Sequence, residues 1–140
     1  MSRFVLDCSV TMAWCFENES DAYARSVLAS IPRGPAVVPP LWFLEVANVL
    51  LVAERRRRIT RIDASRFLEL LAELPVVVAE PEGILGVATL VTLGRDLGLS
   101  AYDACYLHLA RRERMPLATR DRALREAARR AGVALYDPTR

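Results

Sequence analysis

The sequence predicts an α/β fold, a three-layer α/β/α sandwich with a short, mainly parallel central sheet. Short apolar runs alternate along the chain with longer amphipathic segments, which is typical of βα units. The runs are brief and continuously apolar, as strands are when both faces of a parallel sheet are covered. No repeat, linker or low-complexity tract interrupts the 140 residues, so we expect a single domain over residues 1–140.

Five segments have the composition of buried strands, rich in valine, leucine and alanine and bounded by polar, proline or glycine residues. They are Phe4–Leu6, Ala36–Val38, Val76–Val78, Leu117–Ala118 and Val133–Leu135.

The first half of the chain carries clear signals for helix ends. Ser9 can cap a helix directly after the first strand, and Pro39-Pro40 suits the start of a helix over residues 41–53. Asp63 can cap a further helix, which Pro75 stops.

The second half follows the same rules. Pro81-Glu82 begins a helix that ends at Gly98, and Ser100 opens the next one. Asp121 opens the last helix, which Gly132 closes. In parallel α/β sheets, ligands bind in the crevice outside the carboxyl ends of the strands, so polar residues at those ends are candidates for a functional site.

The composition excludes several classes of enzyme. All 19 cationic side chains are arginine, and a P-loop NTPase, a Schiff-base enzyme or a receiver domain needs lysine. The single histidine, His108, argues against a Ser-His-Asp triad. Three cysteines without zinc spacing read as reduced core residues: Cys8, Cys15 and Cys105. We expect a cytoplasmic protein, because no signal peptide or membrane span is recognisable.

Four carboxylates stand out from the rest. Asp7 and Asp121 follow predicted strands, and Glu45 lies in a helix that is apolar nearly all round and therefore predicted to be buried. Asp103 opens a helix. A buried carboxylate such as Glu45 needs a cationic partner or a raised pKa, and either arrangement could be purely structural.

Capping is an alternative for the aspartates. Ser100 and Asp103 have the pattern of a capping box, and Asp121 can cap the helix that follows it. If all four carboxylates converge on one crevice, however, they raise one another's pKa values, and a hard divalent cation resolves that conflict. Mg²⁺ or Mn²⁺ takes oxygen ligands and needs no histidine or thiolate.

The segments VLDCS, PPLWFLEVANVL, SAYDACYLHLA and LATRD resemble, in this order, the four acidic motifs of PIN-domain ribonucleases. The chain length and the order of the motifs resemble VapC-type toxins of bacterial and archaeal toxin–antitoxin pairs. The resemblance spans Phe4 to about Tyr136.

The resemblance implies a metal-dependent endoribonuclease whose cofactor is Mg²⁺ or Mn²⁺. Its catalytic and metal-binding residues would be Asp7, Glu45, Asp103 and Asp121, supported by Ser9, Asn48 and Thr119. It also implies three partners: an RNA substrate, a cognate antitoxin and a second copy of the chain in a homodimer. No membrane is implied.

An acidic site needs cations around it to bind a polyanion. The candidates for RNA binding are two arginine clusters, Arg55, Arg56, Arg57 and Arg58, with Arg61 and Arg66 beyond them, and Arg111 and Arg112, with Arg114. Arginine runs at helix ends also simply solvate a face or complement the helix dipole.

Two other functions stay open at this point. In a non-catalytic nucleic-acid-binding or scaffold module, Glu45 would be ion-paired and the aspartates would be caps. In a phosphatase, Asp7 would be the nucleophile, but Ser9 stands where such an enzyme has a second aspartate, and lysine is absent.

Overall fold

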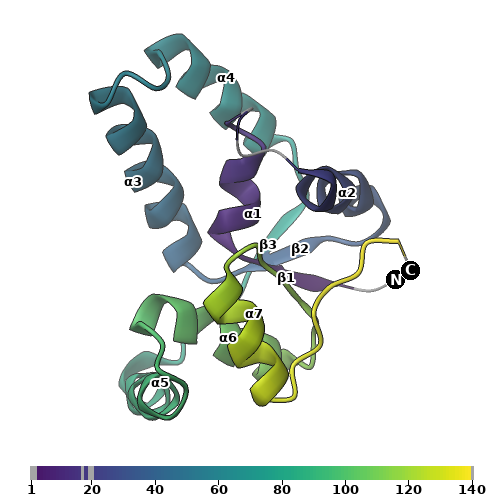
Figure 1. The fold of residues 1–140 in the computed structure, drawn as a ribbon, viewed down its shortest axis with the longest axis vertical. Coiled ribbons are helices and arrows are strands. Elements are labelled where there is room, and N and C mark those ends of the chain that lie inside the picture. The colour runs from purple at the N-terminus through teal and green to yellow at the C-terminus, as the bar shows by residue number, and fades with distance from the viewer. Residues whose placement is uncertain (1–2, 17, 19–20, 140) are drawn as a thin grey trace.

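A computed structural model of the chain describes residues 3–16, 18 and 21–139. Four strands form an all-parallel sheet in the order β3-β2-β1-β4 (Figure 1). Their bounds are β1 Phe4–Leu6, β2 Ala36–Val38, β3 Val76–Val78 and β4 Leu117–Ala118. The predicted α/β/α sandwich with a parallel sheet is confirmed, as are four of the five predicted strands.

The fifth predicted strand, Val133–Leu135, is reduced to a single parallel bridge between Leu117 and Leu135. Leu117 bonds through its N–H to the carbonyl of Ala134 and through its carbonyl to the N–H of Tyr136. Because β4 is only two residues long, no further pairing is available and a full strand does not form.

The helices lie on both sides of the sheet. The helices α1, α2, α3 and α4 occupy one side, and α5, α6 and α7 occupy the other (Figure 1). Their bounds are α1 Cys8–Ala13, α2 Ala22–Ser30, α3 Leu41–Arg55, α4 Arg61–Ala72, α5 Gly83–Leu97, α6 Ala101–Glu113 and α7 Arg122–Arg130, with a short 3-10 helix, η2, at Ile31–Arg33. Strand β1 runs through the middle of the core, and its three residues are fully buried.

Two predicted helix caps are wrong. The cap of α1 is Asp7 rather than Ser9, because the Ser9 hydroxyl donates its proton to the Asp7 carboxylate and lies inside the first turn. The cap of α4 is Thr60, and Asp63 completes a capping box three residues later. Ser100 and Asp121 cap α6 and α7 as predicted.

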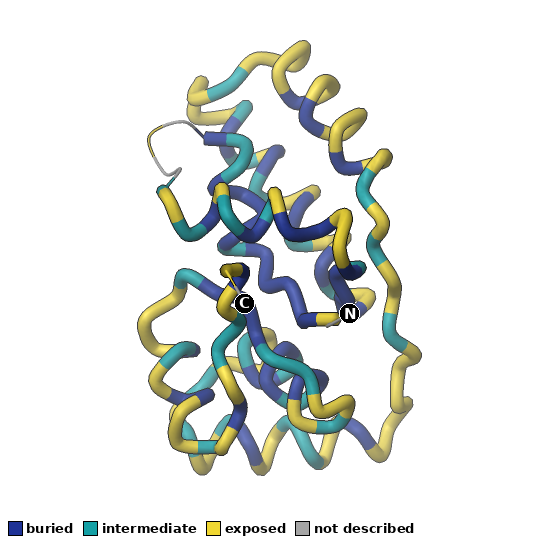
Figure 2. The backbone as a smooth tube through the Cα atoms, turned by 90° about the vertical axis from the view of Figure 1, so that its right-hand side faces the viewer, coloured by how far each residue is buried: buried dark blue, intermediate teal, exposed yellow. Residues whose placement is uncertain are grey.

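Helix α3 is not buried all round, contrary to the prediction from its apolar sequence. One stripe faces the core, at Trp42, Val46, Leu50 and Ala53. The opposite face is open, with Phe43 50% and Leu44 70% exposed. Figure 2 shows how buried, partly buried and exposed positions are distributed along the backbone. Hydrophobicity on every face therefore marks an uncovered apolar surface here, not burial within one chain.

The cysteines have the surroundings that the sequence predicts only in part. Cys8 is buried, whereas Cys15 and Cys105 are partly buried, and no disulfide joins them in the described chain.

No single helix among the described residues is long and apolar enough to cross a bilayer. Helices α5 and α6 meet that test only as a pair bent by 105°.

The position of Asp7 depends on β1, so we predict that Leu6→Ala destabilises the whole domain. Leu6 is fully buried, and a Leu→Ala change in a core costs about 2–5 kcal/mol. Urea denaturation measures the loss. The matched control is Leu44→Ala, on the exposed face of α3, which should change the unfolding free energy by less than about 0.5 kcal/mol. Equal losses in the two variants would contradict the central place of β1.

Candidate active site

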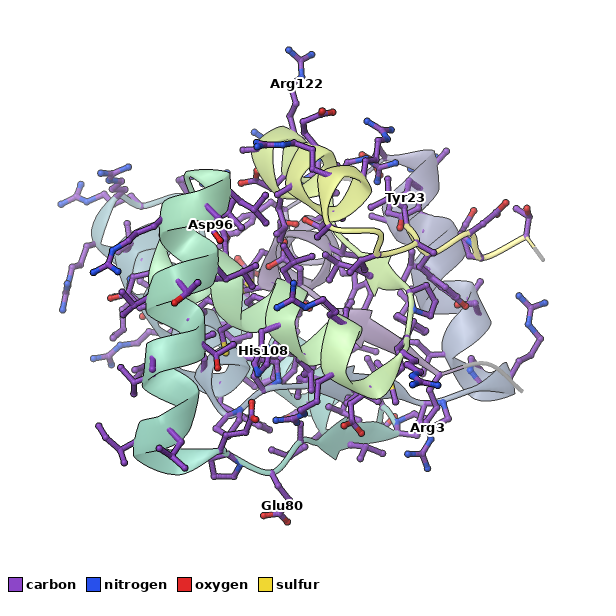
Figure 3. All side chains as sticks on the ribbon, turned by 90° about the horizontal axis from the view of Figure 1, so that it is seen from below. Arg3, Tyr23, Glu80, Asp96, His108 and Arg122 are labelled. Carbon is purple, nitrogen blue, oxygen red and sulfur yellow. The ribbon has the colours of Figure 1, made fainter. Side chains whose placement is uncertain are left out.

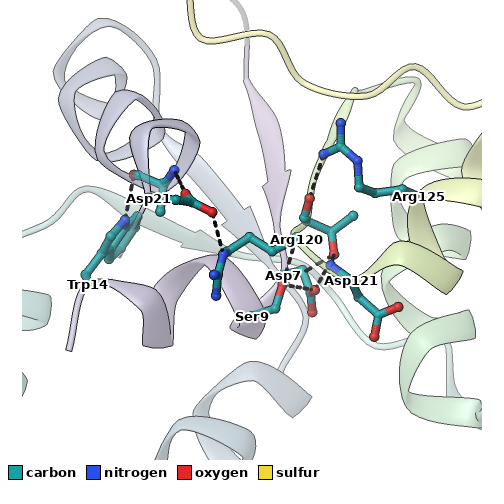
Figure 4. Close-up of polar contacts among 9 residues, drawn as sticks. Asp7, Ser9, Trp14, Asp21, Arg120, Asp121 and Arg125 are labelled. Atoms are coloured by element: carbon teal, nitrogen blue, oxygen red, sulfur yellow. Dashed lines mark hydrogen bonds and ion pairs between the residues drawn. The ribbon is translucent and has the colours of Figure 1, made fainter. Parts of the chain in front are cut away.

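Asp7 lies at the carboxyl end of the central strand and is only 5% exposed. Its Oδ2 atom accepts two short hydrogen bonds, from the hydroxyls of Ser9 and Thr119, each 2.6 Å long (Figure 4). Burial raises the pKa of Asp7, and the two hydroxyl bonds act in the opposite direction by favouring the ionised form. The backbone N–H of Ser9 also lowers the pKa, so the donors that stabilise the Asp7 carboxylate come from Ser9 and Thr119.

The two hydroxyls also tie the end of β1 to the end of β4. Ser9 Oγ accepts the N–H of Arg120 at 3.0 Å, and Thr119 Oγ1 accepts the N–H of Asp121 at 3.1 Å. Each hydroxyl has one proton, which it donates to Asp7, so it can only accept the backbone N–H groups of Arg120 and Asp121. The loop from Thr119 to Asp121 is thereby held in register with Asp7.

Glu45 reaches the site from α3 and is partly buried. Its Oε1 atom accepts a hydrogen bond from the phenol of Tyr106, a fully buried residue of α6. Burial raises the pKa of Glu45, the Tyr106 bond lowers it, and the nearby Asp7 charge raises it again. The partner that the sequence required for this carboxylate is thus a tyrosine rather than an arginine.

Asp103 is presented to the site by half of a capping box. Ser100 Oγ accepts the N–H of Asp103 at 3.1 Å, but the Asp103 carboxylate makes no return bond to Ser100 or to another described residue. Burial, and then the charges of Asp121, Asp7 and Glu45, raise the pKa of Asp103 to about 6. Ser100 therefore caps α6 as predicted, but the carboxylate of Asp103 takes no part in the cap.

Asp121 has the double role that its position suggested. Its Oδ1 atom accepts the N–H of Leu124 at 3.0 Å, which caps α7. That bond occupies one carboxylate oxygen. The negative charge of Asp121 raises the pKa of both Asp7 and Asp103.

All four carboxylates line one pocket of about 350 Å³. They come from four different elements: the end of β1, helix α3, the first turn of α6 and the loop after β4. Within residues 3–16, 18 and 21–139, however, no three His, Cys, Asp or Glu side chains are gathered as closely as a metal cluster requires. The pocket nevertheless offers the ligands that a hard divalent cation prefers, negatively charged carboxylate oxygens. They are arranged more openly than in a closed metal cluster.

The arginines and Asn48 are placed unequally. Arg58 lines the pocket, with its guanidinium 4.3 Å from the centre of the Phe16 ring. Asn48 is exposed on α3 outside the pocket lining, and its supporting role stays a prediction. The other RNA-binding candidates, Arg55, Arg56, Arg57, Arg111 and Arg112, are also absent from the lining, and Arg112 is ion-paired with Glu82 at 2.9 Å.

Two residues of the site were missed from the sequence. Tyr106 could have been found, because it lies three residues after Asp103 and so on the same face of α6. Arg120 lies in the pocket wall and forms an ion pair with Asp21, its Nε 3.0 Å from Oδ2. Nothing in the sequence pairs it with Asp21, since 99 residues separate the two.

Comparison with known proteins agrees with this geometry. Residues 4–130 match the PIN domain family, whose members are in general nucleases. No curated protein matches the sequence significantly.

Two solved structures share the fold. PAE2754 from Pyrobaculum aerophilum superposes with a TM-score of 0.69 at 22% identity, covering 90% of this chain and 86% of that one. FitAcB from Neisseria gonorrhoeae superposes with a TM-score of 0.66 at 16% identity, covering 97% of this chain and 98% of that one. At these identities the similarity concerns the fold.

The raised pKa of Asp103 leads to a prediction about stability without metal. The folded pKa, about 6, lies above the ordinary 3.8, so the folded protein binds this proton more tightly than the unfolded chain. Stability therefore falls as pH rises from about 4 to 6, and the loss persists above that range. Asp103→Asn should remove this loss and stabilise the protein at pH 7.5 by roughly 1 kcal/mol, a value discounted for the partial exposure of the carboxyl group.

Urea denaturation in EDTA at pH 4 and pH 7.5 measures the effect, which should shrink towards zero at the lower pH. Asp96→Asn, on the exposed surface of α5, is the matched control and should show no such pH dependence. Parallel stability curves for Asp103→Asn and the native chain would show that the carboxylates do not repel one another as described.

Proposed function

The chain belongs to the PIN domain family, and from that premise we propose that it is a metal-dependent endoribonuclease, the toxin component of a type II toxin–antitoxin pair. The proposed reaction is hydrolysis of RNA phosphodiester bonds in the pocket between the carboxyl ends of β1 and β4. The observation that carries the proposal is the convergence of Asp7, Glu45, Asp103 and Asp121 on that pocket.

PIN domains in general use divalent metal ions, and the pocket suits Mg²⁺ or Mn²⁺ by its donors. Asp7 would hold the ion together with Asp103 and Asp121. Glu45 would either join them or orient the attacking water. A bound ion supplies charge neutralisation at the phosphoryl oxygens and lowers the pKa of a coordinated water.

The remaining residues keep these carboxylates in place. Ser9 and Thr119 fix the orientation of Asp7, and Tyr106 fixes that of Glu45. Ser100 holds the first turn of α6 through the backbone alone, which leaves the Asp103 carboxylate available. Such positioning matters because catalysis is lost when reacting groups are misplaced by about 1 Å.

An RNA substrate needs cations beside the acidic pocket. Among the arginines proposed from the sequence, Arg58 has the best support, since it lines the pocket and is held over the Phe16 ring. Arg111 and Arg112 have less support, because the rise of 1.5 Å per residue places them about 12 to 14 Å along α6 from Asp103.

The partners belong to the same proposal. Exposed apolar side chains on α3 and α4 surround a groove of about 630 Å³, among them Phe43, Leu51 and Leu68. A surface of this kind favours protein–protein contact, with an antitoxin or with a second copy of the chain. A complex of this kind would act in the cytoplasm.

Replacing Asp7 by Asn should abolish cleavage while the chain stays folded. The expected loss is roughly 10²–10³-fold or more, the effect of removing one group that stabilises charge in a transition state. The assay follows labelled RNA oligonucleotides with Mg²⁺ or Mn²⁺, with and without EDTA. Asp96→Asn makes the same chemical change on the surface and should retain activity. Cleavage that survives both EDTA and the Asp7 change would disprove the metal mechanism.

Metal binding should also be visible as stability, independently of any substrate. At a hundredfold excess over its dissociation constant, Mn²⁺ or Mg²⁺ should add about 2.7 kcal/mol to the free energy of unfolding. Thermal or urea unfolding measures this, and Asp7→Asn should reduce the gain. If neither ion stabilises the native chain, the carboxylates serve as caps and hydrogen-bond partners, and the alternative of a non-catalytic binding module is favoured.

A further inference from the structure

Arg120 is anchored at both ends beside the acidic pocket. Its backbone N–H donates to Ser9 Oγ, the same hydroxyl that bonds to Asp7, so its Cα is fixed relative to the carboxylates. Its side chain crosses to the start of α2, where Nε donates to Asp21 Oδ2 at 3.0 Å. Figure 4 shows the guanidinium beside Asp21, on the side of Asp7 away from the Asp121 carboxylate.

Among the residues that the structure describes, the guanidinium of Arg120 is bonded through Nε alone. Asp21 takes only the Nε–H, and neither terminal nitrogen of Arg120 donates a hydrogen bond to a residue within the described ranges. The side chain is 27% exposed and lines the pocket. An arginine in this state offers two adjacent N–H groups, the geometry that binds phosphate oxygens.

The charge of Arg120 is paired with Asp21, and it is not among the charges that shift the pKa of Asp7, Glu45 or Asp103. Asp21 is a separate carboxylate, 46% exposed; burial raises its pKa, but the Ala24 N–H, Arg120 and Arg25 together lower it below the ordinary value. The charges acting on Asp103 are those of Asp121, Asp7 and Glu45, all negative. Arg120 is therefore a cation held at the edge of the acidic pocket, available to an anion that enters it.

We propose that Arg120 binds a backbone phosphate of RNA next to the scissile one, and that Asp21 is the residue that positions it. The inference rests on the proposed nuclease function and adds to it a subsite formed by α2 and the loop after β4. The reacting phosphate lies among the carboxylates, and Arg120 contacts its neighbour on the α2 side.

Asp21 allows the positioning role to be isolated. Its Oδ1 atom accepts the N–H of Ala24 at 2.7 Å and caps α2, while Oδ2 holds Arg120. Asparagine caps helices about as well as aspartate, so Asp21→Asn keeps the cap but removes the charged acceptor of Arg120. The variant should thus release the guanidinium without unfolding α2.

The test compares a substrate that has neighbouring phosphates with one that has none. Arg120→Gln should raise KM for an RNA oligonucleotide about tenfold or more, as expected for a charged hydrogen bond, with kcat within about twofold. For a nucleoside p-nitrophenyl phosphodiester, which contains a single phosphate, kcat/KM should be unchanged within about twofold. Asp21→Asn should shift KM for RNA in the same direction by a smaller factor.

The control is Arg122→Gln, the same charge change two residues further along. Arg122 is exposed at the start of α7 and projects away from the protein (Figure 3). Its KM values should match those of the native chain. Equal losses of kcat/KM on both substrates for Arg120→Gln would overturn the proposal, because Arg120 would then act on the reacting phosphate or on the fold. An unchanged KM for RNA would overturn it as well.

A binding experiment separates this inference from the nuclease proposal. Fluorescence anisotropy in EDTA, where no cleavage is expected, gives the affinity for the oligonucleotide as a function of salt. Losing one phosphate contact should lower the slope of log K against log[salt] by about 0.7 in Arg120→Gln and leave Arg122→Gln unchanged. If the slope changes as expected but the native chain cleaves no RNA, only the nuclease proposal fails. Cleavage of RNA with an unaltered slope in Arg120→Gln overturns the role of Arg120 alone.

Discussion

The site depends on one interaction, the pair of hydroxyl hydrogen bonds that Ser9 and Thr119 donate to a single oxygen of Asp7. Those bonds join the ends of β1 and β4, which are neighbours in the sheet although more than 100 residues apart in the sequence. They also affect the ionisation of Asp7. Burial raises the pKa of Asp7, and the two hydroxyl donors act against that shift by favouring the ionised form.

This arrangement explains why four carboxylates can occupy one pocket without their charges unfolding the domain. Asp7 is supported by hydroxyls, Glu45 by a phenol and Asp121 by a backbone N–H. Only Asp103 lacks a donor among the residues described, and burial together with the charges of its neighbours raises its pKa to about 6. Asp103, in the first turn of α6, is thus the carboxylate on which the other three charges act without a compensating donor among the described residues.

Much of the fold and of the site was predictable because the signals are local. Continuous apolar runs predicted the strands, and strand-terminal aspartates predicted where Asp7 and Asp121 lie. The errors have physical causes. The apolar sequence of α3 does not say whether its faces are covered by the same chain or left open, and the chain leaves Phe43 and Leu44 exposed. The contact between Arg120 and Asp21 is a tertiary one without periodicity. The sequence position of Ser9 suits both a helix cap and a bond to Asp7, and the structure shows the bond to Asp7.

Helix α6 carries both Asp103 and Tyr106, one turn apart on the same face. The helix therefore contributes one carboxylate to the pocket and orients a second, Glu45, that belongs to α3. Inserting or deleting one residue between them would rotate one relative to the other by about 100°. Within that turn of α6, evolution can therefore exchange side chains only while keeping the number of residues and their helical phase.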